Sequence, residues 1–333
     1  MAQSQEPAGE GARAANDAER LLRRLEWTVI RRLEGVLQGD YRTLFRGFGM
    51  DFADLHEYQA DDDVRYIDWN VTARLQVPYV REFQEDREVA AWFLSDLSGS
   101  LDFGSQTVRK RMLAAEFVAV LARLLTRRGN RVGSVIYRGT GLPPEGALPA
   151  RAGRLHVLHL LDRMLKPRAG QGGARTHDTD LSELIAQAQH AIKRRSVVFL
   201  ISDFVSRPGW ERPLGMLARK HEIIAVRLCD PLESEMPDLG MVVMQDAETG
   251  EQLFVDTHDS GFRRRFAKVA AQREQALREA LACAGVDCLE LSTHEPIDGA
   301  LLRFSRMRKQ RSQLAAGASL AGATARVVAG QAS

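Results

Sequence analysis

The sequence has few cysteines and lacks the usual marks of a secreted or membrane-spanning protein. Its cysteines are Cys229, Cys283 and Cys288, an odd number without CxxC spacing, which indicates ordinary reduced thiols. No apolar stretch approaches the roughly 18 residues that a membrane span requires. Residues 1–18 also lack a hydrophobic signal core. We therefore expect a cytoplasmic protein without a membrane span.

The chain also lacks a strong net charge and two common catalytic motifs. Its formal net charge of +2 provides no broad basic field, so nucleic acid is not an expected partner. The sequence contains neither a Gly-x-Ser-x-Gly nucleophile elbow nor a Gly-x₄-Gly-Lys-Ser/Thr phosphate loop. These absences argue against a serine hydrolase of that type and against an ATPase within this chain.

Composition and hydrophobic patterning divide the chain into five segments. We expect residues 1–16, rich in Ala and Gly, to be disordered, residues 17–39 to form a helix, and residues 40–88 to form a compact leader. An α/β domain is expected over residues 89–310, followed by a flexible tail over residues 311–333. The N-terminal helix is basic and amphipathic, so it either docks on the protein through its apolar face, which we favour, or lies on a membrane surface.

Between residues 89 and 310 the pattern alternates short apolar runs with longer helical periodicities. The predicted strands cover residues 89–94, 132–137, 197–201, 223–228 and 286–291, and the predicted helices residues 107–128, 154–165, 181–192, 260–284 and 297–309. A β-hairpin is expected over residues 241–245 and 252–255. This alternation is typical of a doubly wound, mostly parallel sheet with helices on both faces.

The most informative motif is Asp96-Leu97-Ser98-Gly99-Ser100, which directly follows the first predicted strand. Two later segments carry similar oxygen groups: Asp203 follows another strand, and Thr179 precedes a helix. In an open α/β sheet the loops at the carboxyl ends of the strands form the ligand site. Carboxylate and hydroxyl oxygens are hard ligands that suit Mg²⁺, Ca²⁺ or Mn²⁺.

This arrangement resembles the metal-ion-dependent adhesion site of von Willebrand factor A domains. The resemblance predicts a divalent cation, most simply Mg²⁺, held by Asp96, Ser98, Ser100, Thr179 and Asp203. Each residue also has a simpler interpretation. The two serines can cap the following turn, and Asp203 can cap a helix.

A longer signature precedes the domain. Residues 58–74 read YQADDDVRYIDWNVTAR and residues 46–52 read RGFGMDF. They resemble the signature of the bacterial family catalogued as "domain of unknown function 58", which precedes a von Willebrand A-like domain in its members. The resemblance implies an adaptor or co-chaperone that works with a MoxR-type AAA+ ATPase. Within the signature we expect the acidic run at residues 61–63 to form a turn and Trp69 to lie in the core.

Three functions therefore remain open. The first is a metal-dependent protein-interaction module that performs no chemistry. The second is a Mg²⁺-dependent hydrolase or phosphotransferase with Asp96 as nucleophile. Position 98 is a serine rather than a second acid, and no lysine stands in an obvious assisting place. The third is a metal-free scaffold that retains only the fold.

Overall fold

The structure is a computed structural model that describes residues 8–36, 51–59, 62, 64–84, 90–105, 108–140, 145–166, 179–245 and 251–311. The disorder predicted for residues 1–7 and the tail predicted from residue 312 lie outside the described residues. Across the described ranges, every helix is too short or too polar to traverse a lipid bilayer.

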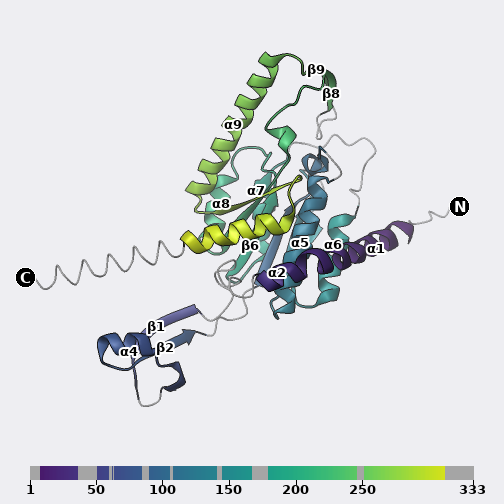
Figure 1. The fold of residues 1–333 in the computed structure, drawn as a ribbon. Helices are drawn as coiled ribbons and strands as arrows, with labels where there is room; N and C mark the ends of the chain where they lie inside the picture. The colour runs from purple at the N-terminus through teal and green to yellow at the C-terminus, as the bar shows by residue number, and fades with distance from the viewer. Residues whose placement is uncertain are drawn as a thin grey trace, which may run out of the picture.

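A six-stranded sheet forms the centre of the molecule (Figure 1). Its strands are β3 (Ala90–Asp96), β4 (Val132–Tyr137), β5 (Glu145–Arg151), β6 (Ser196–Ser202), β7 (Glu222–Cys229) and β10 (Asp287–Ser292). They lie side by side in the order β10-β7-β6-β3-β4-β5. All neighbours run parallel except β4 and β5, which are antiparallel. The prediction of an α/β protein with a mostly parallel sheet is confirmed.

Continuous apolar runs account for the central strands. Every residue of β4 and β6 is buried, as expected of strands covered on both faces. Each parallel strand was predicted to within two residues of its ends. The edge strand β5 was missed because none of its residues is buried and it contains Gly146 and Pro149, which are unusual within strands.

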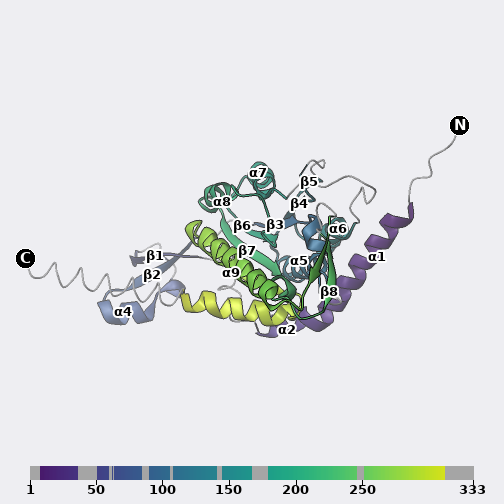
Figure 2. The ribbon, with the colours of Figure 1, turned by 90° about the horizontal axis from the view of Figure 1, so that it is seen from above.

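Helices cover both faces of the sheet (Figure 2). One face carries α1 (Ala8–Leu25), α2 (Arg31–Val36), α5 (Lys110–Arg127), α6 (Arg154–Leu165) and the helix over residues 297–311. The other carries α7 (Leu181–Ala191), α8 (Glu211–Ala218) and the C-terminal end of α9 (Ser260–Cys283). Alternate strand residues serve the two cores. Phe93 stacks on Phe199 in the first core, with ring centroids 5.3 Å apart, whereas Trp92 and Leu200 belong to the second.

The basic N-terminal segment is a docked helix. Leu22 and Leu33 are buried in the core that α5 and α6 share. On the flank of this contact, Arg123 Nε donates to Glu26 Oε1 at 2.6 Å. The rest of the protein thus covers the apolar face of the N-terminal helix, which supports the docked arrangement over a membrane-surface one.

The helix begins at Ala8 rather than near Asp17, so the disorder expected up to residue 16 is wrong for residues 8–16. Four of the residues from 8 to 15 are alanine, which has the highest helix propensity and extends the docked helix toward the N-terminus.

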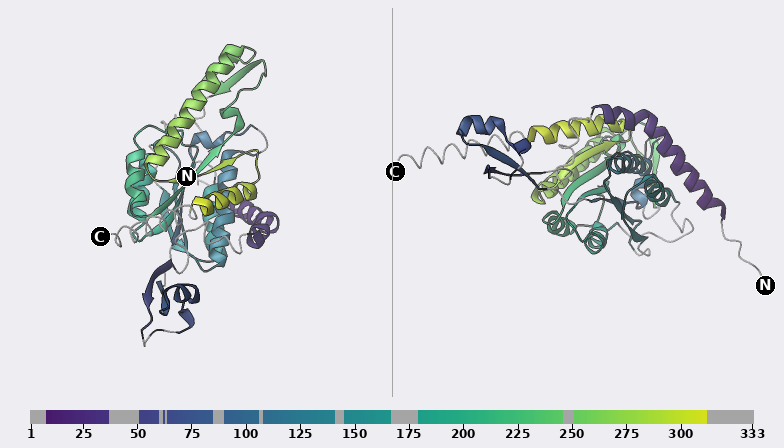
Figure 3. Two further views of the ribbon diagram at one scale, coloured as in Figure 1. Left: turned by 60° about the vertical axis from the view of Figure 1, so that its left-hand side comes forward. Right: turned by 90° about the horizontal axis from the view of Figure 1, so that it is seen from below.

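Two parts of the chain form small sheets of their own. β1 (Asp51–Glu57) pairs antiparallel with β2 (Tyr79–Gln84), and α4 (Trp69–Leu75) lies between them in sequence. β8 (Met241–Gln245) pairs antiparallel with β9 (Gln252–Asp256), which confirms the predicted hairpin. Figures 1 and 3 show these two units at opposite ends of the molecule, with the central sheet between them.

The family signature lies mainly in the β1–β2 unit. Trp69 is 70% exposed at the start of α4, so the prediction that it belongs to the core is wrong. A two-stranded sheet with one short helix has too little apolar surface to cover a large aromatic side chain. Asp62 accepts a hydrogen bond from the backbone N–H of Gln59 at 2.8 Å, as in a turn, while residues 61 and 63 lie outside the described residues.

Candidate functional site

The predicted ligands gather where the strand order of the sheet changes direction. From β3 the chain continues to β4 on one side, and it later returns to β6 on the other side of β3. Open α/β sheets bind ligands at the carboxyl ends of the strands at such a point. Asp96 is the last residue of β3, and Asp203 directly follows β6. Because β3 and β6 are parallel neighbours, both carboxylates reach the same edge.

Asp96 is fully buried, and both of its carboxylate oxygens accept hydrogen bonds. Oδ1 accepts from the backbone N–H of Ser98 at 3.0 Å, and Oδ2 accepts from the hydroxyl of Ser202 at 2.7 Å. Burial, followed by the negative charge of Asp203, raises the pKa of Asp96 to about 6, although the hydrogen bonds lower it. The fold therefore holds a carboxylate whose negative charge is only partly compensated.

The two motif serines turn toward each other. The Oγ atoms of Ser98 and Ser100 lie 3.2 Å apart, with Ser98 buried and Ser100 half-buried. Ser98 immediately precedes the short 3₁₀ turn over Gly99–Asp102, yet its side chain makes no capping hydrogen bond there. Capping by Ser98, the simpler interpretation, is therefore wrong, and the two hydroxyls are directed to a shared position.

Lys110, the first residue of α5, is buried beside Asp203. Its Nζ lies 2.6 Å from Asp203 Oδ2 and 2.6 Å from Glu233 Oε1. Burial lowers the pKa of this lysine, but the two carboxylates outweigh burial and raise the pKa above its usual value. The sequence analysis found no lysine in an obvious assisting place for Asp96, and the structure brings Lys110 into contact with the neighbouring Asp203. The loop folds back so that the Lys110 backbone N–H donates to the Phe103 carbonyl at 3.0 Å.

Thr179 is buried and is tied to both carboxylate segments through backbone contacts. Its carbonyl accepts a hydrogen bond from the hydroxyl of Ser206 in the loop after β6, at 3.1 Å. The next residue, Asp180, donates its backbone N–H to the Tyr137 hydroxyl at 3.1 Å, and the Tyr137 carbonyl accepts from the Leu97 N–H at 2.7 Å. The Thr179 segment therefore lies at the same edge of the sheet as the motif.

The loop that presents Asp203 is held in an unusual backbone conformation. Phe204 has φ +59°, the left-handed region, which costs a non-glycine residue roughly 1–2 kcal/mol. Its ring packs against Trp210 with centroids 5.5 Å apart, and its N–H donates to the Ser202 hydroxyl at 2.9 Å. Asp203 Oδ1 in turn accepts from the Val205 N–H at 3.1 Å. The packing thus maintains a strained turn that fixes the direction of the Asp203 carboxylate.

The segments at this edge carry two carboxylates and three hydroxyls as candidate donors, and oxygen groups of these types fit a hard cation such as Mg²⁺ held by few protein atoms. Among the described residues, no group of three or more His, Cys, Asp or Glu side chains is placed to hold a metal. The hydroxyls of the motif would therefore have to supply part of any coordination.

Lys110, Ser202 and Glu233 complete the network, and the sequence analysis assigned a role to none of them. Ser202 directly precedes Asp203, so its position at this edge follows from the sequence. Lys110 and Glu233 lie far from Asp203 in the chain, so no spacing in the sequence signals their contact.

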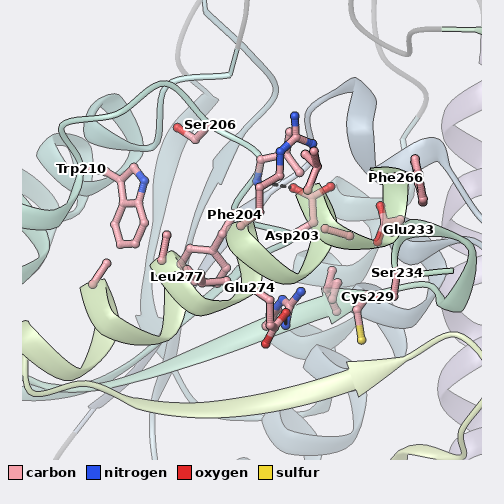
Figure 4. Close-up of a pocket in the computed structure, with 18 of the residues that line it drawn as sticks. Asp203, Phe204, Ser206, Trp210, Cys229, Glu233, Ser234, Phe266, Glu274 and Leu277 are labelled. Carbon is pink, nitrogen blue, oxygen red and sulfur yellow. Dashed lines mark hydrogen bonds and ion pairs between the residues drawn. The ribbon is translucent and has the colours of Figure 1, made fainter. Parts of the chain in front are cut away.

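A groove of about 820 Å³ opens beside Asp203 (Figure 4). Asp203 and Glu233 contribute to its lining, and α9 forms one wall. Much of the remaining lining is aromatic or apolar and includes Phe204, Trp210, Phe262, Phe266 and Leu277. The acidic edge is thus continuous with a largely apolar surface depression.

Two solved structures resemble the chain in part. The first is described as "conserved hypothetical protein BatB from Bacteroides thetaiotaomicron". It is 14% identical, with a TM-score of 0.40, and the match covers 68% of this chain and 99% of that one. The second is an "aerotolerance-related membrane protein" from Bacteroides fragilis. It is 11% identical, with a TM-score of 0.41, over 67% of this chain and 99% of that one.

Sequence relatives are closer. The "Uncharacterized protein Rv1480" of Mycobacterium tuberculosis is 37% identical over 292 residues, which cover 87% of this chain and 89% of the relative. "Uncharacterized protein MAV169" of Mycobacterium avium is 34% identical over 163 residues, 49% of this chain and 94% of the relative. The sequence pattern of the family described as "Protein of unknown function DUF58" matches residues 54–276. The chain therefore belongs to the DUF58 family.

Proposed function

We propose that this protein is a metal-dependent protein-interaction module with a von Willebrand A-like domain. In this proposal Asp96, Ser98, Ser100, Thr179 and Asp203 form a metal-ion-dependent adhesion site for a divalent cation, most simply Mg²⁺. The observation that carries the proposal is the gathering of oxygen donors from three separate segments at the point where the strand order changes.

The electrostatics of the site support a cation. Asp96 and Asp203 repel each other strongly enough to contribute to the raised pKa of Asp96. Lys110 neutralises the other side of Asp203, at Oδ2, and no cation among the described residues lowers the pKa of Asp96. When bound, a dication would supply the missing positive charge and a coordination position for a carboxylate of a partner protein. Ser98 and Ser100 would hold it directly, and Asp203 would balance charge directly or through water.

The partner in this proposal is a MoxR-type AAA+ ATPase, as the family resemblance implies. The largely apolar groove beside Asp203 offers surface for a protein partner to cover. A cytoplasmic location is part of the proposal, because the ATP that such a partner hydrolyses is found there.

Metal dependence is tested by thermal melting in EDTA and in excess MgCl₂. A cation that binds only the folded state raises the melting temperature of the wild type. Asp96→Ala should lose that increase, whereas Asp256→Ala, an exposed carboxylate on the β8–β9 hairpin, should retain it. A wild type that melts identically in both buffers would contradict the metal site.

Partner binding is tested by mixing the purified protein with a purified MoxR-type ATPase from the same organism. We expect a complex by size-exclusion chromatography in MgCl₂, and loss of that complex in EDTA and in the Ser98→Ala/Ser100→Ala double variant. A complex of equal strength in EDTA would favour binding that needs no metal.

Lys110 favours a second candidate, the metal-free scaffold. Its ammonium group already lies between Asp203 and Glu233, so the chain carries a cation of its own at this edge. A hydrolase with Asp96 as nucleophile is less well supported, because both oxygens of that buried carboxylate are engaged in hydrogen bonds. The melting experiment separates the scaffold from the metal-dependent module.

A further inference from the structure

A second cavity, of about 460 Å³, lies at the opposite edge of the sheet from the candidate metal site. Lys193 and Arg195 line it just before β6 begins, and Lys220 and His221 line it just before β7 begins. Because β6 and β7 run parallel, their starts face away from the edge where Asp203 lies. The cavity therefore belongs to a different part of the surface.

The cations around this cavity have no side-chain partners among the described residues. Within the part of the chain that the structure describes, Lys193, Arg195 and Lys220 make neither a hydrogen bond nor an ion pair through their side chains. None of the described residues that line the cavity is an aspartate or a glutamate. Three positive charges therefore share one concave space without an acid among its described lining residues, and such a space attracts anions.

His221 adds an independent observation at the same place. The residue is only 7% exposed, and its Nδ1 is buried without a hydrogen-bond partner among the described residues. Burial, and then the charge of Lys220, lower the pKa of this histidine, so its ring is neutral near pH 7 and keeps one N–H to donate. Buried polar atoms without partners are rare in folded proteins, and each requires an explanation.

The ends of two helices explain only part of this arrangement. Lys193 follows the end of α7, and Lys220 follows the end of α8, where positive charges interact favourably with the helix dipole. That interaction needs no cavity, and it does not account for the buried nitrogen of His221. An anionic ligand would account for the charges, the space and the unpartnered nitrogen together.

We propose that this cavity binds a small phosphate-bearing anion. Lys193, Arg195 and Lys220 bind the phosphate oxygens, and His221 completes the contact with a hydrogen bond. A phosphate dianion matches the three cations better than a single carboxylate does. The volume exceeds that of phosphate alone and lies in the range of small-molecule sites. The apolar side chains of Ile192, Met216 and Leu217 line the rest of the cavity and can contact an organic group that carries the phosphate.

Isothermal titration calorimetry on the full chain tests the site, with inorganic phosphate and ADP as probes. All samples contain EDTA, so the outcome does not depend on the candidate metal site. NaCl brings every sample to the same ionic strength. We expect saturable binding of at least one probe. Tighter binding of ADP would identify a nucleotide as the source of the phosphate, and tighter binding of inorganic phosphate would identify the free anion.

Two variants and a matched control locate the binding. Lys220→Ala should raise the dissociation constant about tenfold, which is the effect of losing one charge-assisted contact. Lys268→Ala removes an exposed lysine on α9, outside the cavity, and should leave the constant unchanged. His221→Leu should weaken binding and also raise the melting temperature without ligand, because it removes a buried nitrogen that lacks a partner.

The proposal is wrong if neither probe shows saturable binding at concentrations up to roughly 10 mM. It is equally wrong if Lys220→Ala and Lys268→Ala bind alike. If His221→Leu fails to fold, the comparison of Lys220→Ala with Lys268→Ala still tests the site, because both variants change solvent-exposed side chains.

Discussion

The two edges of the central sheet hold their charged side chains in opposite ways. At the carboxyl edge, Lys110 is buried and contacts two carboxylates at 2.6 Å each. At the amino edge, Lys220 is exposed, and its side chain makes no ion pair or hydrogen bond within the described residues. A buried and paired charge is part of what keeps the fold intact, whereas an exposed and unpaired one is available to a ligand. The same residue type therefore has a structural role at one edge and a binding role at the other.

The largest effect should come from Lys110→Met, which keeps the aliphatic stem and removes the charge. Asp203 then remains buried without its cation, and breaking a buried pair in this way costs about 3–5 kcal/mol. Urea unfolding in EDTA measures the free energy of unfolding. Lys268→Met, at an exposed position of α9, is the matched control and should stay within about 0.5 kcal/mol of wild type. If Lys110→Met lowers the free energy of unfolding by less than about 1 kcal/mol, Lys110 has no structural role, and the two edges do not differ in the way described.

Asp96→Asn should increase the free energy of unfolding, whereas Lys110→Met should decrease it. The pKa of Asp96 is about 6 in the fold and 3.8 in the unfolded reference, so the folded state binds the proton more tightly. Wild-type stability therefore falls as the pH rises from about 4 to about 6. In EDTA at pH 7.5 the variant, which has no charge to bury, should be more stable by about 3 kcal/mol, and near pH 4 the difference should vanish.

The difference in stability between wild type and Asp96→Asn should also depend on excess MgCl₂ at pH 7.5. If the wild type binds the cation, its stability rises while that of Asp96→Asn changes little, so the gap between the two narrows. A pH-independent difference between wild type and variant in EDTA would contradict the raised pKa.

The two edges also differ in how far the sequence predicted them. The strands β3 and β6 are continuous apolar runs, so the polar residues at their carboxyl ends, Asp96 and Asp203, were expected at one edge of a parallel sheet. The partners of those residues were not expected. Lys110 reaches Asp203 from helix α5, and the contact joins residues 93 positions apart in the chain. Local periodicity carries no information about such a contact.

The amino edge was not predicted as a site at all. Lys193 and Arg195 belong to a run of basic residues before β6, which resembles an ordinary solvated surface in the sequence. His221 has no metal-binding or catalytic spacing. Only the fold shows that these residues share a cavity and that a histidine nitrogen is buried there without a partner in the described part of the chain.

A smaller effect, conditional on metal, is expected for Thr179→Val, which keeps the shape of the side chain and removes the hydroxyl. At a Mg²⁺ concentration 100 times its dissociation constant, the wild type gains about 2.7 kcal/mol, and the variant should lose most of that gain. Urea unfolding with and without EDTA measures both values. Thr28→Val, an exposed threonine of the docked N-terminal helix, should keep the whole gain. An unchanged gain in Thr179→Val would remove that hydroxyl from the proposed ligand set.

The smallest effect on stability should come from Lys220→Ala, the counterpart of Lys110→Met at the opposite edge. Its side chain contacts no hydrogen-bonding or charged partner among the described residues, so in phosphate-free buffer the free energy of unfolding should stay within about 0.5 kcal/mol of wild type. At low ionic strength the variant should become slightly the more stable protein, because unscreened repulsion from Lys193 and Arg195 acts on Lys220 in the wild type and is absent from the variant. Urea unfolding at 10 mM and at 200 mM NaCl measures this difference. A clear loss of stability at both salt concentrations would mean that Lys220 supports the fold, and the contrast between a structural and a binding lysine would then fail.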